Sequence, residues 1–355
     1  MSAESQEQVI RIGTRRSKLA LKQVDLIMAE LSAVHPGAKF EVHPIATMGD
    51  KDKVTPLPQL GKGLWTNELE AALVQKEVDF IVHCLKDMPT SVPAGCLLGC
   101  VTKREDPRDV VIFSARHGDK YKKLADLPAG SVVGTSSVRR AAQLRRWYPG
   151  LEFKDVRGNI ETRLQKCDDE ELGYDCIILA AAGLHRMNYN ARIAQYLESG
   201  TEGGGMLHAV GQGALGLEVR ENDERILSML KVVEDTPTMM AGFAERSLLR
   251  TLEGGCSVPI GVETTWLDGE EEDGGRKLKI VATVVSLDGK RFVDGEMVQE
   301  VASLAQADSL GKKLAQDLVD RGAQKILDEI NKVRAGPGAV KLGDVTVNAT
   351  AAPAV

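Results

Sequence analysis

The amino-acid sequence predicts an α/β protein with two domains of similar plan, followed by a small α+β domain. Three observations support this prediction. The chain has 355 residues, too many for one small domain and suitable for two or three of ordinary size. Over the first 230 residues, strand-like and helix-like segments alternate. The same order of segments occurs twice, which indicates an internal repeat.

The first copy of the repeat begins with a short apolar segment, 9–13, that predicts a strand. Residues 17–31 place apolar side chains at helical spacing, and residues 39–46 alternate as a strand does. A second helix is predicted over 64–75. The continuous apolar run at 78–85 is typical of a parallel strand that is buried on both faces of a sheet.

The second copy follows the same plan. Residues 131–137, like residues 10–17, predict a strand, a Gly-Thr step and the start of a helix. A strand-like segment at 151–156, a helix at 159–166 and an apolar strand at 174–183 come next. This repeated order predicts two α/β domains.

A third region begins near residue 236 and has a different pattern. It opens with a helix, continues with strands and ends with one long amphipathic helix, which together predict a small α+β domain. From Ala335 onward the chain is rich in Gly, Ala and Pro, so we expect a disordered tail. The predicted elements are a helix at 240–255, an exposed hairpin loop at 269–277, strands at 278–286 and 292–301, and a helix at 307–330.

Charge and composition exclude several classes of function. The chain has 45 basic and 51 acidic residues, a net charge of −6, which makes it a poor general nucleic-acid binder. Aromatic residues make up only 4%, too few for a platform that stacks single-stranded bases. The N-terminus lacks the apolar core of a secretion signal, and no long apolar run predicts a membrane span.

Cysteine usage indicates a reducing compartment. The cysteines form no CxxC pair and show no zinc-ligand spacing with histidines. We therefore expect a cytoplasmic protein with mostly buried, reduced thiols and no bound metal. The cysteines are Cys84, Cys96, Cys100, Cys167, Cys176 and Cys256.

Basic residues concentrate in one stretch of this acidic chain. The planar fork of arginine binds carboxylates or phosphates through paired hydrogen bonds. Few acidic residues interrupt the stretch from Gly134 to Lys166, so it predicts a local anion site. Its basic members are Arg139, Arg140, Arg145, Arg146, Lys154, Arg157, Arg163 and Lys166.

Hydroxyl groups accompany these arginines where a predicted strand turns into a helix. The segment GTSSVRR places Thr135, Ser136 and Ser137 at this turn, where hydroxyls and free backbone N–H groups bind anions. The segment GTRRS repeats the arrangement with Arg15 and Ser17. The alternative is a solvated basic helix face with ordinary caps. Because the arrangement occurs twice, we expect a cleft between two domains that binds a polyanion.

A second candidate for chemistry is HCLKDMPT, at 83–90, where an apolar strand ends in Lys86 and Asp87. Ligands of α/β sheets gather at the carboxyl ends of strands. There Asp87 is suited to act as a general acid or to stabilise a developing cation, and Lys86 to bind an anion. The alternative is an aspartate that caps a helix beside a surface lysine. Inside the strand, His83 is expected to be a core histidine with its own partner.

A third candidate is LEGGCSVP, at 252–259. Two glycines before Cys256 permit a close approach of the backbone, and the proline after it restricts the exit of the loop. A cysteine on such a loop is suited to be a nucleophile or a covalent anchor. The alternative is a buried structural thiol.

The GxGxxG match at 211–216 does not predict a dinucleotide site. Such a site needs a strand before the glycines and a helix after them. Here a Gly-rich stretch comes first, and the strand-like LGLEVR comes after. We expect a hinge or tight turn where the chain passes back between domains.

The motifs resemble those of the porphobilinogen deaminase family from about residue 9 to about residue 330. Each motif alone is weak, whereas the ordered set is specific. In chain order the motifs are RIGTRRSKLAL, HCLKDMPT, GTSSVRRAAQL, VRGNIETRL, ILAAAGLHRM, AVGQGALG and LEGGCSVP.

The resemblance implies three domains. The first two would have the fold of bilobed periplasmic binding proteins, and the third would carry the cofactor cysteine. It also implies that the chain returns to the first domain after AVGQGALG. The expected boundaries are 9–105 with 207–229 for domain 1, 106–206 for domain 2, 230–334 for domain 3 and 335–355 for the tail.

The resemblance further implies a transferase of heme and tetrapyrrole biosynthesis. Four porphobilinogen molecules would be joined head to tail with release of ammonia, and water would release hydroxymethylbilane. The chain would grow on a covalently bound dipyrromethane cofactor. The family resemblance also suggests a monomer, with no nucleic-acid or membrane partner.

Matching the motifs gives each candidate residue an expected role. Asp87 corresponds to the catalytic aspartate, which would stabilise positive charge on a pyrrole and shuttle protons. Because each pyrrole carries acetate and propionate, many arginines are needed in an otherwise acidic protein. The expected cofactor-binding residues are Cys256 (thioether), Lys86, Cys84, Thr135, Ser136, Ser137, Arg139, Arg140, Arg163 and Gln212. The expected substrate-binding residues are Arg15, Ser17, Arg157 and Arg186.

The sequence departs from the family pattern at a few positions. Cys84 replaces the usual Ser, and its thiol is a weaker hydrogen-bond donor. Trp65 replaces the usual Phe and still permits stacking, and TMGD at 47–50 replaces TTGD. The segment 50–63 is loop-like and is expected to be a mobile lid over the growing chain.

Two other classes of function remain as rival hypotheses. A non-catalytic anion-binding protein would need neither Cys256 nor a covalent modification. A nucleic-acid binder would use the arginines of 139–166 and would show strongly salt-dependent binding.

Overall fold

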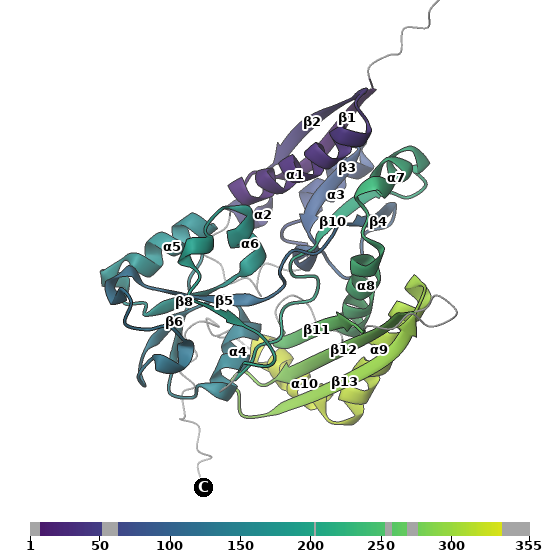
Figure 1. Cartoon of the computed structure of the whole chain (residues 1–355). Coiled ribbons are helices and arrows are strands. Elements are labelled where there is room, and N and C mark those ends of the chain that lie inside the picture. Colours follow the sequence, from purple (N-terminus) through teal and green to yellow (C-terminus); the bar gives the residue numbers. More distant parts are fainter. Residues whose placement is uncertain (1–7, 52–62, 202–203, 253–257, 268–275, 336–355) are drawn as a thin grey trace, which may run out of the picture.

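The computed structural model describes residues 8–51, 63–201, 204–252, 258–267 and 276–335 (Figure 1). These residues form two five-stranded mixed sheets and one three-stranded antiparallel sheet, each with its own helices. Each sheet belongs to one of three domains, named the first, second and third domain in chain order. In Figure 1 the first domain lies at the top, the second at the left and the third at the bottom.

The first domain has the strand order β2-β1-β3-β10-β4. Strand β1 runs parallel to β2 and β3, whereas β10 runs antiparallel to both of its neighbours. Its apolar side chains are buried because helix α1 places Ala20, Val24, Ile27 and Leu31 on one face, against the sheet. The elements are β1 (Gln8–Arg15), α1 (Lys18–Val34), β2 (Ala38–Ile45), α2 (Met48–Lys51), α3 (Asn67–Val74), β3 (Phe80–Cys84), β4 (Cys96–Val101), β10 (Leu215–Arg220) and α7 (Glu224–Leu230).

The second domain repeats this plan with the order β7-β6-β8-β5-β9. Strand β6 is parallel to β7 and β8, and β5 is antiparallel to β8. Strand β5 is buried along its whole length, as expected for a central strand covered on both faces. The elements are β5 (Asp109–Phe113), β6 (Val132–Gly134), α4 (Val138–Trp147), β7 (Glu152–Lys154), α5 (Ile160–Asp168), β8 (Cys176–Ala180), α6 (Ala181–Arg186) and β9 (Gln195–Leu197).

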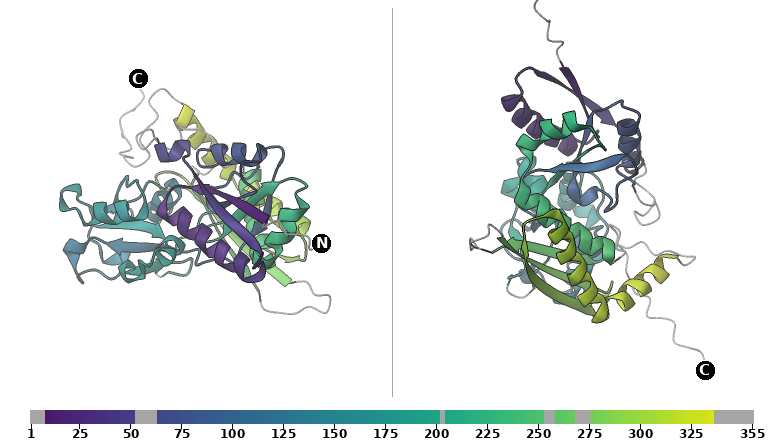
Figure 2. Two further views of the ribbon diagram at one scale, coloured as in Figure 1. Left: turned by 90° about the horizontal axis from the view of Figure 1, so that it is seen from above. Right: turned by 90° about the vertical axis from the view of Figure 1, so that its right-hand side faces the viewer.

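The third domain is an antiparallel sheet, β11-β12-β13, with helices on one side. Helices α8 and α9 pack on each other, and Figure 2 shows α9 lying along the sheet. Leu278 and Ile280 of the sheet meet Leu310 and Leu314 of α9 in one buried core. The elements are α8 (Thr236–Thr251), β11 (Ile260–Trp266), β12 (Arg276–Val285), β13 (Phe292–Val301), α9 (Leu304–Asp320) and α10 (Ala323–Ala335).

The structure confirms the predicted plan of two similar α/β domains and a small third domain. It corrects two details. The single helix predicted over 307–330 is two helices, because Gly322 has φ of +102° and ends the helical path. Arg276 and Lys277, predicted in a loop, begin β12. The rest of that loop, the tail after Ala335 and most of the proposed lid lie outside the described residues.

Strands β4 (Cys96–Val101), β5 and β9 were not predicted from the sequence. The predicted turn at the Gly-rich match is confirmed: Gly211 and Gly213 have φ of 71° and 92°, and strand β10 comes directly after. A side chain at Gly213 would place its Cβ 2.2 Å from the carbonyl oxygen of Glu105, so only glycine fits. The chain thus returns to the first sheet through this turn, while the domain boundaries at 105, 206 and 229 stay a prediction.

Within the part of the chain that the structure describes, no helix is both long and apolar enough to cross a bilayer.

Candidate active site

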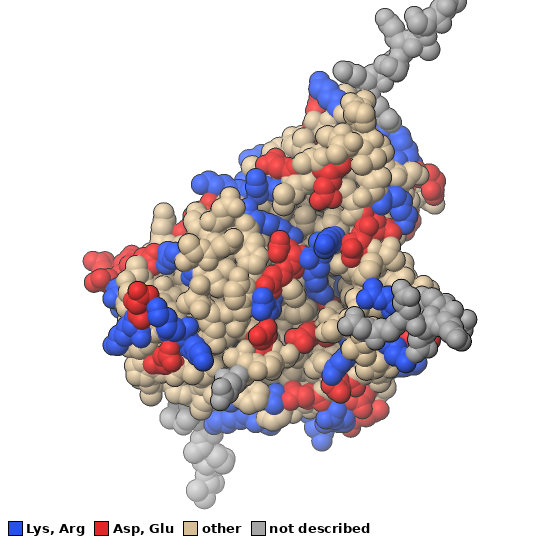
Figure 3. Space-filling model, in the orientation of Figure 1, with Lys and Arg blue, Asp and Glu red and all other residues tan. Residues whose placement is uncertain are grey.

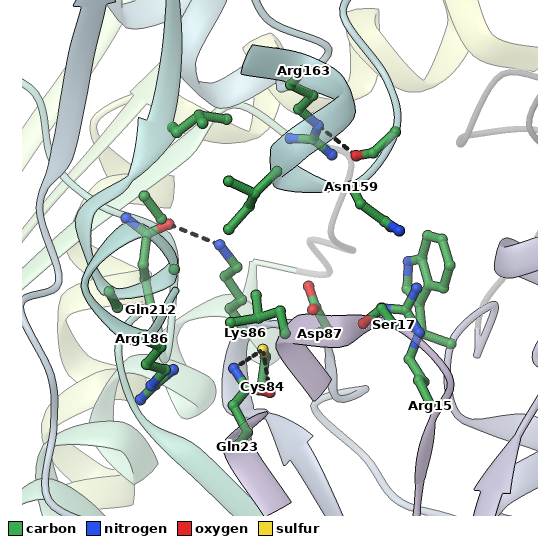
Figure 4. Close-up of a pocket in the computed structure, with 18 of the residues that line it drawn as sticks. Arg15, Ser17, Gln23, Cys84, Lys86, Asp87, Asn159, Arg163, Arg186 and Gln212 are labelled. Carbon is green, nitrogen blue, oxygen red and sulfur yellow. Dashed lines mark hydrogen bonds between the residues drawn. The ribbon is translucent and has the colours of Figure 1, made fainter. Parts of the chain in front are cut away.

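A cavity of about 340 Å³ lies between the first and second domains (Figure 4). From the first domain it is lined by residues at the ends of β1 and β3, and from the second by α5, α6 and the end of β8. The turn at 212–214 forms part of its wall. Eleven of the predicted site residues line this cavity: Arg15, Ser17, Cys84, Lys86, Asp87, Ser136, Arg140, Arg157, Arg163, Arg186 and Gln212.

Asp87 and Lys86 reach the cavity because a short 3₁₀ turn, Leu85–Asp87, comes directly after β3. The turn is held by Leu85, which is 1% exposed and whose backbone N–H donates to the carbonyl of Ala214 at 3.0 Å. The Nζ of Lys86 donates to Oε1 of Gln212 at 3.3 Å. Burial lowers the pKa of Lys86, and the neighbouring carboxylate of Asp87 opposes that shift. The predicted acid, Asp87, and the predicted anion-binding Lys86 therefore face one cavity.

Several arginines bring positive charge into the same space. The Nε of Arg163 donates to the carbonyl of Gly158 at 2.7 Å, and Nη2 of Arg186 donates to the carbonyl of Gly213 at 2.7 Å. Burial, and then the nearby Arg140, lower the pKa of Arg163 to about 10. Burial likewise lowers the pKa of Arg186. These cations are poorly solvated, so a ligand with several carboxylates would complement them.

Arg139 and Arg140 form a buried ionic cluster with Asp109, at the start of β5. Asp109 accepts from Nη1 of Arg139 at 2.7 Å and from Nε and Nη2 of Arg140 at 2.9 and 2.7 Å. Burial alone would raise the pKa of Asp109, but the two arginines outweigh it and hold that pKa well below its usual range. Arg140 lines the cavity and Arg139 does not, since Arg139 also donates to the carbonyl of Leu207 at 2.7 Å. Arg139 therefore stands behind the cavity wall.

The predicted hydroxyl groups divide into two kinds. Ser17 and Ser137 are N-caps, which accept from the backbone N–H of Ala20 and Arg140 at 3.2 and 3.4 Å. Thr135 accepts from the N–H of Ser137, and neither Thr135 nor Ser137 lines the cavity. Ser17 and Ser136 do line it, and Ser136 donates to the carbonyl of Val156 at 3.0 Å. Helix α4, which Ser137 caps, does not have the solvated face that the alternative hypothesis required, because every residue from 138 to 144 is buried.

Two glutamines, Gln23 and Gln212, line the cavity. Gln212, predicted from the motifs, donates to Asp109 at 3.0 Å and to the carbonyl of Pro107 at 2.6 Å, which connects Lys86 to the ionic cluster. Gln23 was not predicted, and its Nε2 lies 3.1 Å from Sγ of Cys84. Burial, and then Asp87, raise the pKa of the Cys84 thiol. The sequence does carry a signal for Gln23: it is a polar residue, 2% exposed, on the apolar face of α1.

His83 is a core histidine, as expected. Its ring is buried, and Nε2 lies 2.9 Å from Oε2 of the buried Glu218 on β10. Cys256 lies outside the described residues, so its predicted position is not seen.

The face of the molecule in Figure 3 does not favour a nucleic-acid interface. Lys, Arg, Asp and Glu are interspersed on the face in Figure 3, and no single-sign field covers it. The cavity does concentrate positive charge, since five arginines and Lys86 line it.

Two family models match the chain. "Porphobilinogen deaminase, dipyromethane cofactor binding domain" matches residues 10–228, and "Porphobilinogen deaminase, C-terminal domain" matches residues 240–320. A porphobilinogen deaminase of Neurospora crassa is 63% identical over 342 residues, 96% of this chain and 99% of that protein. One of Yarrowia lipolytica is 51% identical over 326 residues, 90% of this chain and 93% of that protein.

Among solved structures, the effector-binding domain of BenM with benzoate is 15% identical, with a TM-score of 0.36. The match covers 70% of this chain and 94% of that domain.

Proposed function

The chain belongs to the porphobilinogen deaminase family, and from this premise we propose how the cavity between its first two domains carries out the reaction. The activity is the stepwise head-to-tail condensation of porphobilinogen to hydroxymethylbilane with release of ammonia, a step of tetrapyrrole biosynthesis. The enzyme is a transferase, and its cofactor is a covalently bound dipyrromethane. The roles of individual residues in this reaction are our proposal.

One observation supports the assignment above all: Asp87 shares its cavity with five arginines and one lysine. Porphobilinogen carries two carboxylates, so each added unit increases the negative charge in the site. The poorly solvated guanidinium groups of Arg163 and Arg186 are suited to receive these carboxylates with paired hydrogen bonds. Binding would thereby offset the repulsion among the cations themselves.

Asp87 is the catalytic residue in this proposal. Carbon–carbon bond formation between two pyrroles leaves positive charge on a ring nitrogen, and a carboxylate beside that N–H stabilises it electrostatically. The same oxygen can take up the proton that the ring then loses. Nζ of Lys86 donates to Gln212 at 3.3 Å and forms no ion pair with Asp87 in the described part of the chain, so this proposal leaves the Asp87 carboxylate to the substrate.

The donor set fits a cofactor with several carboxylates. We propose that Lys86, Cys84, Ser136, Arg140, Arg163 and Gln212, which line the cavity, contact it directly. Thr135, Ser137 and Arg139 are proposed to support these contacts through the α4 N-terminus and Asp109. When bound, the cofactor supplies the pyrrole carbon on which the product is built. Arg15, Ser17, Arg157 and Arg186 are proposed to bind incoming substrate.

Cys256 is the proposed attachment point, on the segment between α8 and β11. The test is the intact mass of the denatured chain with peptide mapping, and we expect two linked pyrrole units on the Cys256 peptide. Cys256→Ser should remove that mass, while Cys84→Ser should keep it. An unmodified wild-type chain that stays unmodified after incubation with porphobilinogen would contradict the anchor and favour a non-catalytic anion-binding protein.

We further propose that the enzyme acts as a monomer in the cytoplasm, without nucleic-acid or membrane partners. Five free cysteines among the described residues, four of them buried, support a reducing compartment. Light scattering after size exclusion tests the oligomeric state, and a mass near 38.4 kDa is expected.

A further inference from the structure

Helix α8 belongs to the third domain and also packs against the first domain (Figure 1). Ala244 and Leu248 of this helix lie in the core of the third domain. Phe243 packs against that core and against an apolar cluster of the first domain, which contains Leu85 and Met88. These two residues bracket the two charged residues that the first domain places in the cavity after β3. The third domain therefore contacts the segment that carries the proposed acid.

Arg246, on the same helix, donates to the backbone directly after Asp87. Its Nη2 donates to the carbonyl of Pro89 at 2.6 Å, and its Nη1 donates to the carbonyl of Met88 at 3.4 Å. Arg246 is only 5% exposed, so water has little access to replace these hydrogen bonds. The planar fork of one buried guanidinium therefore holds two successive carbonyls of the first domain.

The backbone at Asp87 is held on both sides along the chain. Before it, the N–H of Leu85 donates to the carbonyl of Ala214 at 3.0 Å. After it, Met88 is 2% exposed, and its N–H donates to the carbonyl of Leu85 at 3.3 Å. Arg246 then holds the carbonyls at positions 88 and 89. With both flanks fixed, the Asp87 carboxylate has a restricted range of positions in the cavity that it lines.

We propose that Arg246 is a positioning residue for Asp87, through which the third domain fixes the acid in the cavity. Arg246 does not line the cavity, so it acts through the backbone at positions 88 and 89. A carboxylate that stabilises charge on a reacting ring must lie within a fraction of an ångström of its productive position. The inference rests on the proposed catalytic role of Asp87. It adds that turnover depends on a contact between the first and third domains.

Arg220 offers a matched control. Its Nη1 also donates to two backbone carbonyls, those of Leu73 and Val78, at 3.1 and 2.6 Å. Its side chain is 15% exposed, and it pairs with carboxylates of the first domain. Arg220 is the last residue of β10, whereas the turn that lines the cavity, 212–214, lies before the start of that strand. Its loss should therefore cost stability without moving Asp87.

The first test is steady-state kinetics of the holoenzyme with porphobilinogen, below the melting temperature of every variant. Arg246→Met keeps the length of the side chain and removes its donors. It should lower kcat about tenfold to 100-fold, while KM changes less than about twofold. Arg220→Met should lower the melting temperature and change kcat less than about twofold. A raised KM with unchanged kcat for Arg246→Met, or equal losses of kcat in the two variants, would overturn the proposal.

A milder variant keeps the test decisive if Arg246→Met does not fold. Arg246→Lys keeps the charge and one donor but loses the planar fork, so it should lower kcat about threefold with KM unchanged. In that case a kcat equal to that of the wild type would overturn the proposal.

Intact mass provides a readout that does not depend on turnover. Because α8 leads into the segment that contains Cys256, cofactor loading must be measured for each variant. Arg246→Met should carry the same two linked pyrrole units on the Cys256 peptide as the wild-type chain. A folded variant that lacks this mass would place the effect of Arg246 in cofactor attachment and would overturn its role in positioning Asp87.

A double-mutant cycle separates this inference from the proposed function. If Arg246 acts through Asp87, Arg246→Met should lower kcat less than about twofold further once Asp87→Asn is present. Effects that multiply would overturn the positioning role. If Asp87→Asn alone leaves kcat unchanged, the proposed catalytic role of Asp87 fails, and the inference fails with it. If Asp87→Asn lowers kcat and Arg246→Met does not, only the positioning inference fails.

Discussion

The sheets of the first and second domains match strand for strand, with β2-β1-β3-β10-β4 corresponding to β7-β6-β8-β5-β9. The match extends to single hydrogen bonds. Asp79 accepts from the backbone N–H of Arg11 at 2.8 Å, and Asp175, at the corresponding place before β8, accepts from that of Val132 at 2.7 Å. Both domains thus use an aspartate, buried in the first domain and half-buried in the second, to join the same two strands.

The two domains differ where their strands reach the cavity. In the register of the first sheet, Leu215 lies opposite Cys84, and in that of the second, Asp109 lies opposite Ala180. One position is therefore apolar in one domain and ionic in the other, where Asp109 holds Arg139 and Arg140. In the first domain, the 3₁₀ turn that comes directly after β3 supplies Lys86 and Asp87 to the cavity. One plan therefore places the proposed catalytic acid on one side of the cavity and four of its five arginines on the other.

The largest effect should come from removing the ionic cluster of the second domain. Asp109→Asn would leave two buried guanidinium groups without their carboxylate, and we expect a loss of about 3–5 kcal/mol in the free energy of unfolding. Denaturant unfolding measures it, and a loss under about 1 kcal/mol would contradict the buried pairing.

Giving the second domain the apolar pattern of the first sharpens this comparison. Leu19 and Ala20 occupy, after Ser17, the places of Arg139 and Arg140 after Ser137. The triple substitution Asp109→Leu, Arg139→Leu, Arg140→Ala should recover most of the lost stability, since apolar groups can replace a buried ionic cluster. Its KM should still rise, because Arg140 lines the cavity.

A somewhat smaller effect is expected from the acid of the first domain. Asp87→Asn should lower kcat at least about 100-fold, about 2.7 kcal/mol in the barrier, without changing the unfolding free energy. Glu161, an acid that lines the cavity from the second domain, serves as the comparison, and Glu161→Gln should lower kcat less than about tenfold. Similar losses of kcat for the two variants would show that Asp87 contributes only as one of several charges in the cavity. A loss under about tenfold for Asp87→Asn would reduce it to a binding role.

The equivalent glycines Gly13 and Gly134 provide a finer comparison of the two sheets. A Cβ at Gly134 would lie 2.7 Å from Ile177 and 2.9 Å from Tyr174, whereas one at Gly13 would lie 3.2 Å from Val78. Gly134→Ala should therefore destabilise the protein by about 1–3 kcal/mol, and Gly13→Ala by less. Thermal melting of the two variants tests this. A larger loss of melting temperature for Gly13→Ala than for Gly134→Ala would contradict the prediction.

The smallest effect should be a difference in pH response. Burial, and then the charge of Glu218, raise the pKa of Glu70 in the first domain, so the folded state resists its ionisation and loses stability as the pH rises past 4.5. At Glu245, in contrast, the positive charge of Arg104 outweighs the effect of burial and lowers the pKa of the Glu245 carboxyl to about 2. That group stabilises the fold above pH 4.5 and loses its contribution as the pH falls towards 2.

Two variants measure this contrast. Glu70→Gln should stabilise the protein near neutral pH and have no effect in acid. Glu245→Gln should destabilise it near neutral pH, because it weakens the pairing with Arg104. Unfolding free energies over a pH series would contradict this account if both variants changed stability in the same direction.

Much of the fold and site could be predicted from local patterns. The apolar run at 78–85 predicted β3, and the polar step after it predicted that Asp87 and Lys86 reach a cavity. Strand β5 was missed although its five residues include four apolar ones, and so was the role of Asp109 at its start. A charged residue at a strand end looks exposed in sequence, because the arginines that bury it lie 30 and 31 residues further along.

The sequence by itself determined the plan of the domains, the family and the residue types of the site. Periodicity and short motifs are local, so they survive without knowledge of the fold. Only the tertiary structure decided that Arg139 and Arg140 pair with Asp109 and that Arg140, but not Arg139, also lines the cavity. It also decided that Trp65 meets Arg15, because these residues are fifty positions apart and touch only when β1 and α3 pack side by side. Which side chains contact each other depends on their distances in the folded protein, and these distances cannot be read from spacing along the chain.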